Sequence, residues 1–159
     1  MAKLVLSYPA WTGEGGLFSW FSKRNGRWPP LNIALLGAVA EEAGHDVTIL
    51  DAEVMEWTKE KLAAEIIKLK PDIVGFTAYS PFFHLSCDAA QAVKQLNPDI
   101  PIIVGGPHIT ITRKKAMLPQ FDYGFVGEAE DSLPEFLNAL SGGAKFISQV
   151  KGILYRKAG

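Results

Sequence analysis

The chain has 159 residues, of which 48% are hydrophobic and 21% are charged, so its composition is that of one globular domain with a single sizeable core. Its formal net charge of -1 at pH 7 provides no broad attraction for nucleic acid or for an anionic membrane surface. The single cysteine excludes an intramolecular disulfide and fits the reducing cytoplasm, and no apolar run approaches the roughly 20 residues of a membrane span.

The first third of the chain predicts a strand, a long loop, a helix and a second strand. Lys3–Tyr8 is a short run rich in β-forming residues, and Pro9–Pro29 follows it as a loop. Pro30 begins a helix at the position where proline is best tolerated, and Gly44 ends that helix as a cap. Val47–Leu50 then predicts the second strand.

The rest of the chain repeats this alternation of helix and strand. Thr58 caps a second helix, which Pro71 ends. The later elements are expected in this order: the strand Ile73–Phe76, the loop Thr77–Phe83, the helix His84–Leu96, the strand Ile102–Val104, a short helix near Thr112–Leu118, the strand Tyr123–Val126 and the helix Asp131–Leu140. A final run, Gly152–Arg156, alternates in polarity and predicts a half-exposed edge strand.

The alternation is typical of an α/β fold with a doubly wound, five-stranded parallel sheet, helices on both faces and an extra strand at the carboxyl-terminal edge. In open α/β sheets, ligands bind outside the carboxyl ends of the strands. The loops that follow the predicted strands are therefore the expected ligand platform.

Three of these loops carry residues that suit a ligand. Gly105-Gly106 has no side chains, so a bulky group can press against the backbone there. Thr77 and Ser80 offer hydroxyl groups, and Glu128 and Glu130 place two carboxylates just past the fifth strand. Each feature also has a structural interpretation: a tight turn for the glycines, turn caps for the hydroxyls, and a cap of the last helix for the carboxylates.

The histidines and the cysteine predict no metal centre. His108 is either a ligand contact or a hydrogen-bonded loop residue, whereas His45 and His84 fit structural positions in a turn and at a helix start. No Cys/His cluster has zinc spacing, and Cys87 is expected to be a structural thiol. The sequence lacks a complete GxGxxG fingerprint, a phosphate loop and a GxSxG elbow, although Asp51 resembles the acidic residue of dinucleotide sites.

The loop Pro9–Pro29 combines aromatic and basic residues. It holds Trp11, Trp20 and Trp28, three of the four tryptophans of the chain. Such a mixture suits the covering of a flat apolar ligand or docking on another domain. The alternative is that the loop packs back on its own sheet.

Several short segments form a pattern that spans nearly the whole chain. They are Pro29-Pro30-Leu31 with Ala34, Glu42-Ala43-Gly44-His45, the strand that ends at Asp51, Asp72–Thr77, Ile103–His108, Asp122–Glu130 and Lys151–Arg156. Each motif is weak alone, but in this order and spacing they resemble the amino-terminal, cobalamin-binding domain of cobalamin-dependent radical SAM enzymes.

The resemblance implies a sheet of order 2-1-3-4-5 with a corrin ring across the strand ends. The residues that it places at the cofactor are Thr77, Ala78, Tyr79, Ser80, Gly105, Gly106, Pro107, His108, Gly127, Glu128 and Glu130. It further implies that residues 1–145 form the cobalamin-binding domain and that residues 146–159 lead toward a radical SAM domain outside this chain. S-adenosylmethionine and a [4Fe-4S] cluster would bind to that other domain.

Two departures from known motifs limit what this chain does alone. The Asp-x-His-x-x-Gly motif is missing, so cobalt is not expected to be ligated by such a histidine. The Cys-x-x-x-Cys-x-x-Cys motif is missing too, because Cys87 is the only cysteine. We therefore expect no catalytic residue and no metal ligand here, and interpret the chain as an amino-terminal fragment of a radical SAM enzyme such as a methyltransferase.

Two alternatives remain open at this point. One is a nucleotide-binding enzyme domain of the Rossmann type, with Asp51 on a ribose. The other is a member of the same family that has lost cobalamin and acts in docking.

Overall fold

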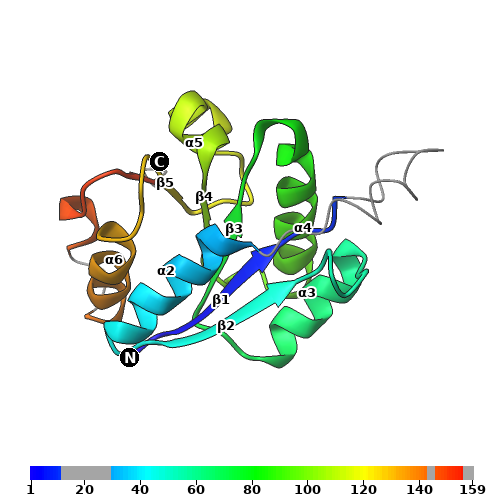
Figure 1. Cartoon of the computed structure of the whole chain (residues 1–159), viewed down its shortest axis with the longest axis horizontal. Helices are drawn as coiled ribbons and strands as arrows, with labels where there is room; N and C mark the ends of the chain where they lie inside the picture. The colour runs from blue at the N-terminus through cyan, green and yellow to red at the C-terminus, as the bar shows by residue number, and fades with distance from the viewer. Residues whose placement is uncertain (12–29, 143–145, 156–159) are drawn as a thin grey trace.

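A six-stranded sheet with helices on both faces forms the protein in a computed structural model, which describes residues 1–11, 30–142 and 146–155 (Figure 1). The strands are β1 (Lys3–Tyr8), β2 (Asp46–Asp51), β3 (Ile73–Thr77), β4 (Ile102–Gly105), β5 (Tyr123–Phe125) and β6 (Ile153–Tyr155). Their order is β2-β1-β3-β4-β5-β6, with β1 to β5 parallel and β6 antiparallel at the edge. The predicted sheet order and the predicted edge strand are confirmed.

The helices also follow the predicted sequence of elements, with one difference. They are α2 (Leu31–Glu42), α3 (Lys59–Lys68), α4 (Phe83–Leu96), α5 (Pro107–Thr112) and α6 (Ser132–Ser141), with the 3-10 turns η2 (Ser80–Phe82), η3 (Arg113–Ala116) and η4 (Ile147–Gln149). The hydroxyl of Thr58 accepts a hydrogen bond from the Lys61 backbone N–H at 3.3 Å, so the predicted cap of α3 is confirmed.

The helix after β4 begins earlier than the sequence suggested. A helix near Thr112–Leu118 was expected, but α5 begins at Pro107 and passes into η3 at Arg113. Pro107 occupies the first helical position, where its fixed φ fits and its missing N–H costs nothing. The loop after β4 is therefore only Gly106 long.

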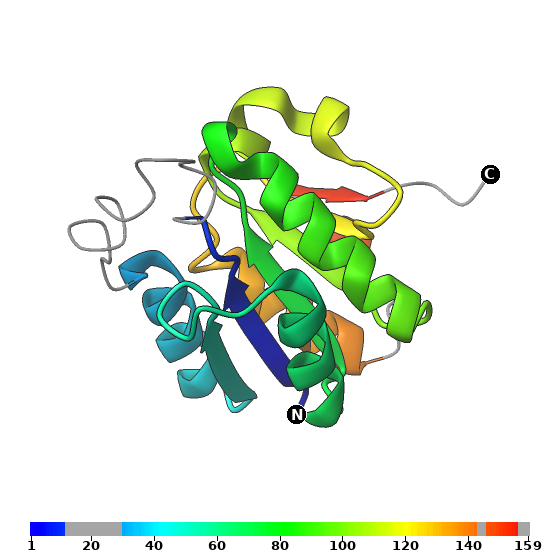
Figure 2. The same cartoon turned by 90° about the vertical axis from the view of Figure 1, so that its right-hand side faces the viewer.

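Each face of the sheet carries its own pair of helices. Figures 1 and 2 show α3 and α4 over one face and α2 and α6 over the other. Side chains alternate between the faces along each strand, as strand geometry requires. On β1, Val5 packs with the core under α3 and α4, whereas Leu4 and Leu6 pack with the core under α2 and α6.

The aromatic loop lies almost wholly outside the described residues, and its role stays a prediction. Trp11 is described: its backbone N–H donates to Glu53 Oε2 at 2.7 Å, and its ring centroid lies 5.2 Å from that of Phe82. Across the described parts of the chain, no helix is both long and apolar enough to cross a bilayer.

Candidate functional site

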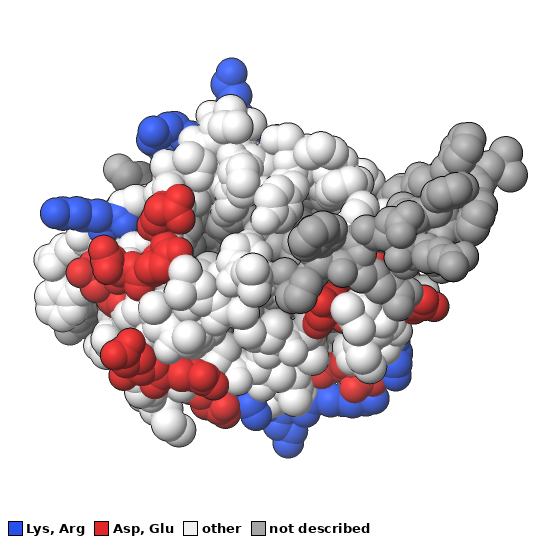
Figure 3. Space-filling view, in the orientation of Figure 1, with Lys and Arg blue, Asp and Glu red and all other residues white. Residues whose placement is uncertain are grey.

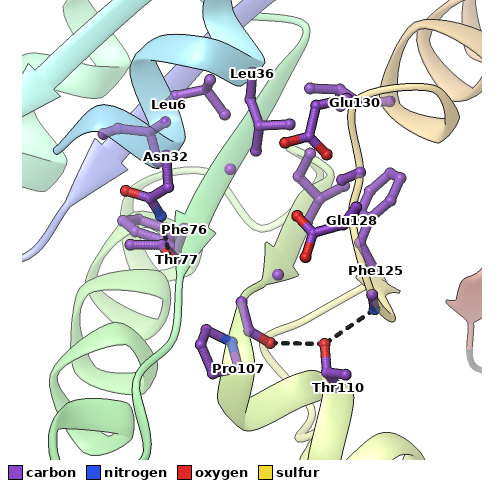
Figure 4. A pocket seen from close by; sticks show the side chains of 18 of the residues that line it. Leu6, Asn32, Leu36, Phe76, Thr77, Pro107, Thr110, Phe125, Glu128 and Glu130 are labelled. Carbon is purple, nitrogen blue, oxygen red and sulfur yellow. Dashed lines mark hydrogen bonds between the residues drawn. The ribbon is translucent and has the colours of Figure 1, made fainter.

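A cavity of about 430 Å³ lies at the carboxyl ends of the strands, on the face that α2 and α6 share. It is lined by Leu6, Asn32, Ile33, Leu36, Gly75, Phe76, Thr77, Tyr79, Ile103, Gly105, Gly106, Pro107, Thr110, Ile111, Phe125, Gly127, Glu128, Ala129, Glu130 and Leu133. Most of this lining is apolar, and the few polar groups are arranged along its walls (Figure 4). A volume of this size falls in the range of sites for small molecules, about 300 to 1,000 Å³.

The floor of the cavity contains two strand glycines. Positions 75 on β3 and 105 on β4 lie on the same face of the sheet as Ile103, because successive residues of a strand alternate between its two faces. A Cβ atom on Gly105 would find only Phe125 Cβ within 4 Å, at 3.7 Å. Since the protein itself leaves room at Gly105, a larger side chain there would project into the cavity.

Gly106, by contrast, is fixed by the protein backbone. Its φ of 103° lies in the region that favours glycine, and a Cβ atom would stand 2.9 Å from the Ala78 carbonyl oxygen. The Ala78 N–H donates to the Gly105 carbonyl at 2.8 Å, and the His108 N–H donates to the Ala78 carbonyl at 3.1 Å. These bonds hold the loops after β3 and β4 side by side, so Gly106 is needed for this close approach whatever the ligand.

The end of β3 is tied to the first turn of α2. The Asn32 side-chain N–H donates to the Thr77 hydroxyl at 3.1 Å, and the Ser86 hydroxyl donates to the Thr77 carbonyl at 2.7 Å. Thr77 therefore lines the cavity and also connects β3 to α2 and α4 through these hydrogen bonds. Tyr79, two residues after Thr77, also lines the cavity, with its ring edge-on to Tyr8 at a centroid distance of 6.3 Å.

Ser80 and His108 lie together outside the cavity. His108 Nδ1 and the Ser80 hydroxyl oxygen are 3.1 Å apart, and the imidazole stacks on Phe83 at a centroid distance of 4.1 Å. Neither residue lines the cavity, and Ala78 does not line it either. The eight other predicted site residues do line it.

The wall opposite α2 is the loop between β5 and α6. The Gly127 N–H donates to the Thr110 hydroxyl at 3.0 Å, and that hydroxyl donates to the Gly106 carbonyl at 3.2 Å (Figure 4). Thr110 thus connects α5 to the loop that carries Glu128 and Glu130. Both carboxylates point into the cavity (Figure 4).

An acidic groove lies beside the cavity, with Glu128 and Glu130 on its border. Its other charged lining residues are Glu42, Asp131, Glu135 and Lys151. Figure 3 shows carboxylates gathered over the side of the molecule formed by α6 and the end of α2. The cavity therefore has an apolar floor and an acidic side wall.

Asp51 and Cys87 have structural roles. Asp51 Oδ1 accepts from the backbone N–H groups of Glu53 and Val54 at 3.0 and 3.1 Å, so this carboxylate holds the turn after β2.

Burial raises the pKa of the Cys87 thiol to about 11, which keeps it protonated at neutral pH and agrees with the predicted structural thiol. Among the described residues, no three His, Cys, Asp or Glu side chains are grouped as a metal site.

Sequence reasoning identified the strand-end loops but missed the residues that face them from the helices. Asn32, Leu36 and Thr110 line the cavity, yet none directly follows a strand. The apolar residues of α2 lie all around the helix, since Leu31 and Leu35 are exposed while Ile33 and Ala40 are buried. The sequence of α2 therefore does not tell which of its side chains face the sheet.

Comparisons with known proteins agree on one family. Residues 21–137 match the family model described as B12 binding domain. An uncharacterized methyltransferase, PH0819, from Pyrococcus horikoshii is 34% identical over 133 residues, which cover 82% of this chain and 28% of that protein. An anaerobic magnesium-protoporphyrin IX monomethyl ester cyclase from Rubrivivax gelatinosus is 32% identical over 136 residues, which cover 82% of this chain and 24% of that protein. The chain thus spans about a quarter of these relatives.

Solved structures give the same fold. The radical S-adenosylmethionine methyltransferase TsrM from Kitasatospora setae, with cobalamin and a [4Fe-4S] cluster bound, superposes with a TM-score of 0.79 at 20% identity, covering 99% of this chain and 28% of that one. The cobalamin-dependent S-adenosylmethionine radical enzyme OxsB, with aqua-cobalamin and S-adenosylmethionine bound, gives 0.79 at 18% identity, covering 99% and 21%.

Proposed function

The chain belongs to the B12-binding domain family, and we propose that it holds cobalamin with the corrin ring across the strand ends and the nucleotide tail in the cavity between α2 and α6. The observation that carries this proposal is the bare floor at Gly105, where the protein leaves space that it does not fill. The tail ends in a flat, largely apolar bicyclic base, which suits a cavity whose floor is apolar.

The size of the cavity supports this division of the cofactor. A corrin ring with its amide side chains is too large for about 430 Å³, so only the tail fits inside. The ring then occupies the surface just beyond the strands, where Ser80 and His108 lie outside the cavity. We propose that Ser80 and His108 contact the corrin and that Thr77, Tyr79, Gly105, Gly106, Pro107, Gly127, Glu128 and Glu130 surround the tail. Ala78 is fully buried, so it cannot reach the ring, and its backbone instead joins the loops after β3 and β4.

The role of this chain is to bind and position the cofactor. Cobalamin, when bound, supplies the group-transfer chemistry through its cobalt. The residues of the chain exclude water from the tail and hold its orientation, and we assign no catalytic residue to them. Asp51 holds its own turn through two backbone bonds, which removes the support for the alternative of a dinucleotide site.

We also propose that the parent protein is a radical SAM enzyme, such as a methyltransferase. Relatives that match over 82% of this chain carry the names methyltransferase and cyclase and are roughly three to four times its length. Residues 1–145 would hold the cofactor, and residues 146–159 would lead to the radical SAM domain, with β6 anchored on β5. A Cys-x-x-x-Cys-x-x-Cys motif in the coding sequence beyond Gly159 is the expected finding.

Retention of cobalamin tests the binding proposal. The full 159-residue chain is mixed with hydroxocobalamin and desalted, and the visible spectrum of the eluted protein is recorded. Wild type is expected to elute with cobalamin, and Gly105→Leu is expected to lose it because the side chain would enter the cavity. Gly142→Leu, at the exposed end of α6, is the matched control and should retain it. Equal retention by Gly105→Leu and wild type would contradict the placement of the tail.

A further inference from the structure

The carboxylate of Glu130 is the one polar side chain of the cavity with a buried atom that lacks a hydrogen-bond partner in the described structure. Its Oε2 atom is buried and unpaired. Figure 4 shows this carboxylate on the loop between β5 and α6, with Glu128 between it and Thr110. An unpaired buried carboxylate oxygen is costly, and native proteins keep few such groups.

A structural role in the fold does not account for Glu130. The first turn of α6 has Asp131 at its cap position, and no side-chain hydrogen bond caps the helix there. The Leu133 N–H instead donates to the Ala129 carbonyl at 2.8 Å. The interpretation of Glu130 as a helix cap is therefore not supported, and the orientation of its carboxylate needs another partner.

The chemistry of that partner follows from the lining. An ionised carboxylate accepts hydrogen bonds and donates none, so the group facing it must be a donor. The nucleotide tail of cobalamin carries ribose hydroxyl groups, which are donors, and a phosphate, which is an anion. Like charges repel, so the phosphate must face away from Glu128 and Glu130.

We propose that Glu130, assisted by Glu128, accepts hydrogen bonds from the ribose hydroxyls of the cobalamin tail and so fixes which way the tail lies. This inference rests on the proposed function, because it assumes that the tail occupies the cavity. The inference gives Glu128 and Glu130 a role in specificity, because they would favour a corrinoid with a complete nucleotide over one that lacks it.

Dissociation constants for two corrinoids test the inference on the full 159-residue chain. The ligands are cobalamin and cobinamide, which keeps the corrin amides but lacks the nucleotide. Glu130→Leu, of similar size, is expected to bind cobalamin about 10- to 100-fold more weakly, the range for a hydrogen bond to a charged group, and to bind cobinamide as wild type does. Glu130→Gln keeps an acceptor oxygen and should lose less.

A second measurement separates this role from a structural one. Because Glu130 Oε2 has no partner in the described protein, Glu130→Leu without ligand should unfold at a temperature no lower than wild type. Glu41→Gln changes an exposed carboxylate on α2 that lines neither the cavity nor the acidic groove, and it is the matched control, with wild-type affinity for both corrinoids.

The outcomes are distinct. Failure of wild type to bind cobalamin would overturn the proposed function itself. Wild-type binding with an unchanged affinity in Glu130→Leu would overturn only the role of Glu130. An equal loss of affinity for cobalamin and cobinamide would place the donor on the corrin amides and overturn the assignment to the ribose. A lower unfolding temperature of unliganded Glu130→Leu would attribute the weaker binding to a less stable fold and would also overturn the assignment.

Discussion

At the carboxyl ends of β3 and β4, the two faces of the sheet differ: one face presents large side chains, and the other presents small residues. Under α3 and α4, β3 presents Val74 and Phe76, which are buried in that core. Under α2 and α6, the same strand presents Gly75 and Thr77, which line the cavity. On β4, Val104 belongs to the first face, and Gly105 to the second.

This difference separates stability from binding within one small fold. A parallel sheet covered on both faces needs apolar side chains on both. On β3 and β4, the small residues Gly75, Thr77 and Gly105 lie on one face, near the carboxyl ends, where ligands of α/β proteins bind. The face under α3 and α4 should therefore determine most of the stability, and the face under α2 and α6 should determine binding.

The strongest test of this comparison is to truncate a large side chain in the core under α3 and α4. Phe121 is fully buried in the core under α3 and α4, with its ring 6.1 Å from that of Phe83. Phe121→Ala is expected to lower the free energy of unfolding by about 3–5 kcal/mol, since it removes buried apolar surface and leaves a cavity. Urea unfolding followed by circular dichroism measures this change.

Leu36→Ala is the matched test on the other face. Leu36 is only partly buried and already borders the empty space of the cavity. Its truncation should cost about 1 kcal/mol in the same experiment, because fewer contacts are lost. Equal losses for the two variants would show that the two faces do not divide stability and binding in this way.

The glycine pair gives a second, smaller test. Gly106→Ala should lower the free energy of unfolding by roughly 1–3 kcal/mol without any ligand, because φ is 103° and the new Cβ would meet the Ala78 carbonyl. Gly105→Ala has room for its Cβ and should stay within about 1 kcal/mol of wild type. Urea unfolding of the two variants, measured together, distinguishes them. A similar loss at both positions would mean that the pair acts as one tight turn.

The sequence predicted the architecture because local signals and sheet geometry agree. Thr58 as a cap, and Pro9 and Pro71 as ends, bound elements that the structure also has. The start of α5 was not predicted because Gly105-Gly106-Pro107 is also typical of a turn that ends a strand. Proline in a first helical turn is nevertheless the same signal that identifies α2.

The candidate site was predictable only on the side of the strands. Because parallel strands end at one edge, Thr77, Gly105 and Gly127 had to lie near one another. Asn32 contacts Thr77, which lies 45 positions later in the sequence, and Ser80 pairs with His108, which lies 28 positions later. Such pairings depend on how far α2 and α5 stand from the sheet, which no local pattern encodes.

The smallest expected effect concerns a buried histidine at the opposite end of the sheet from the cavity. His45 Nδ1 accepts a hydrogen bond from the Ala2 N–H at 3.1 Å, in the loop between α2 and β2. Burial is the main cause that lowers the pKa of His45 below its usual value of 6.5. Below pH 6.5 the unfolded chain then takes up a proton that the folded chain does not, so the free energy of unfolding should fall as the pH decreases through this range.

Urea unfolding between pH 7.5 and 5 measures this slope, and the contribution of His45 is the difference from His45→Asn. Asparagine keeps an acceptor for the Ala2 N–H but does not titrate, so the variant should have a shallower dependence. Cobalamin retention should be the same in both proteins, because His45 lies far from the strand ends that form the cavity. Parallel slopes would exclude His45 as the titrating group, whereas a loss of cobalamin in His45→Asn would show that the two ends of this face are coupled.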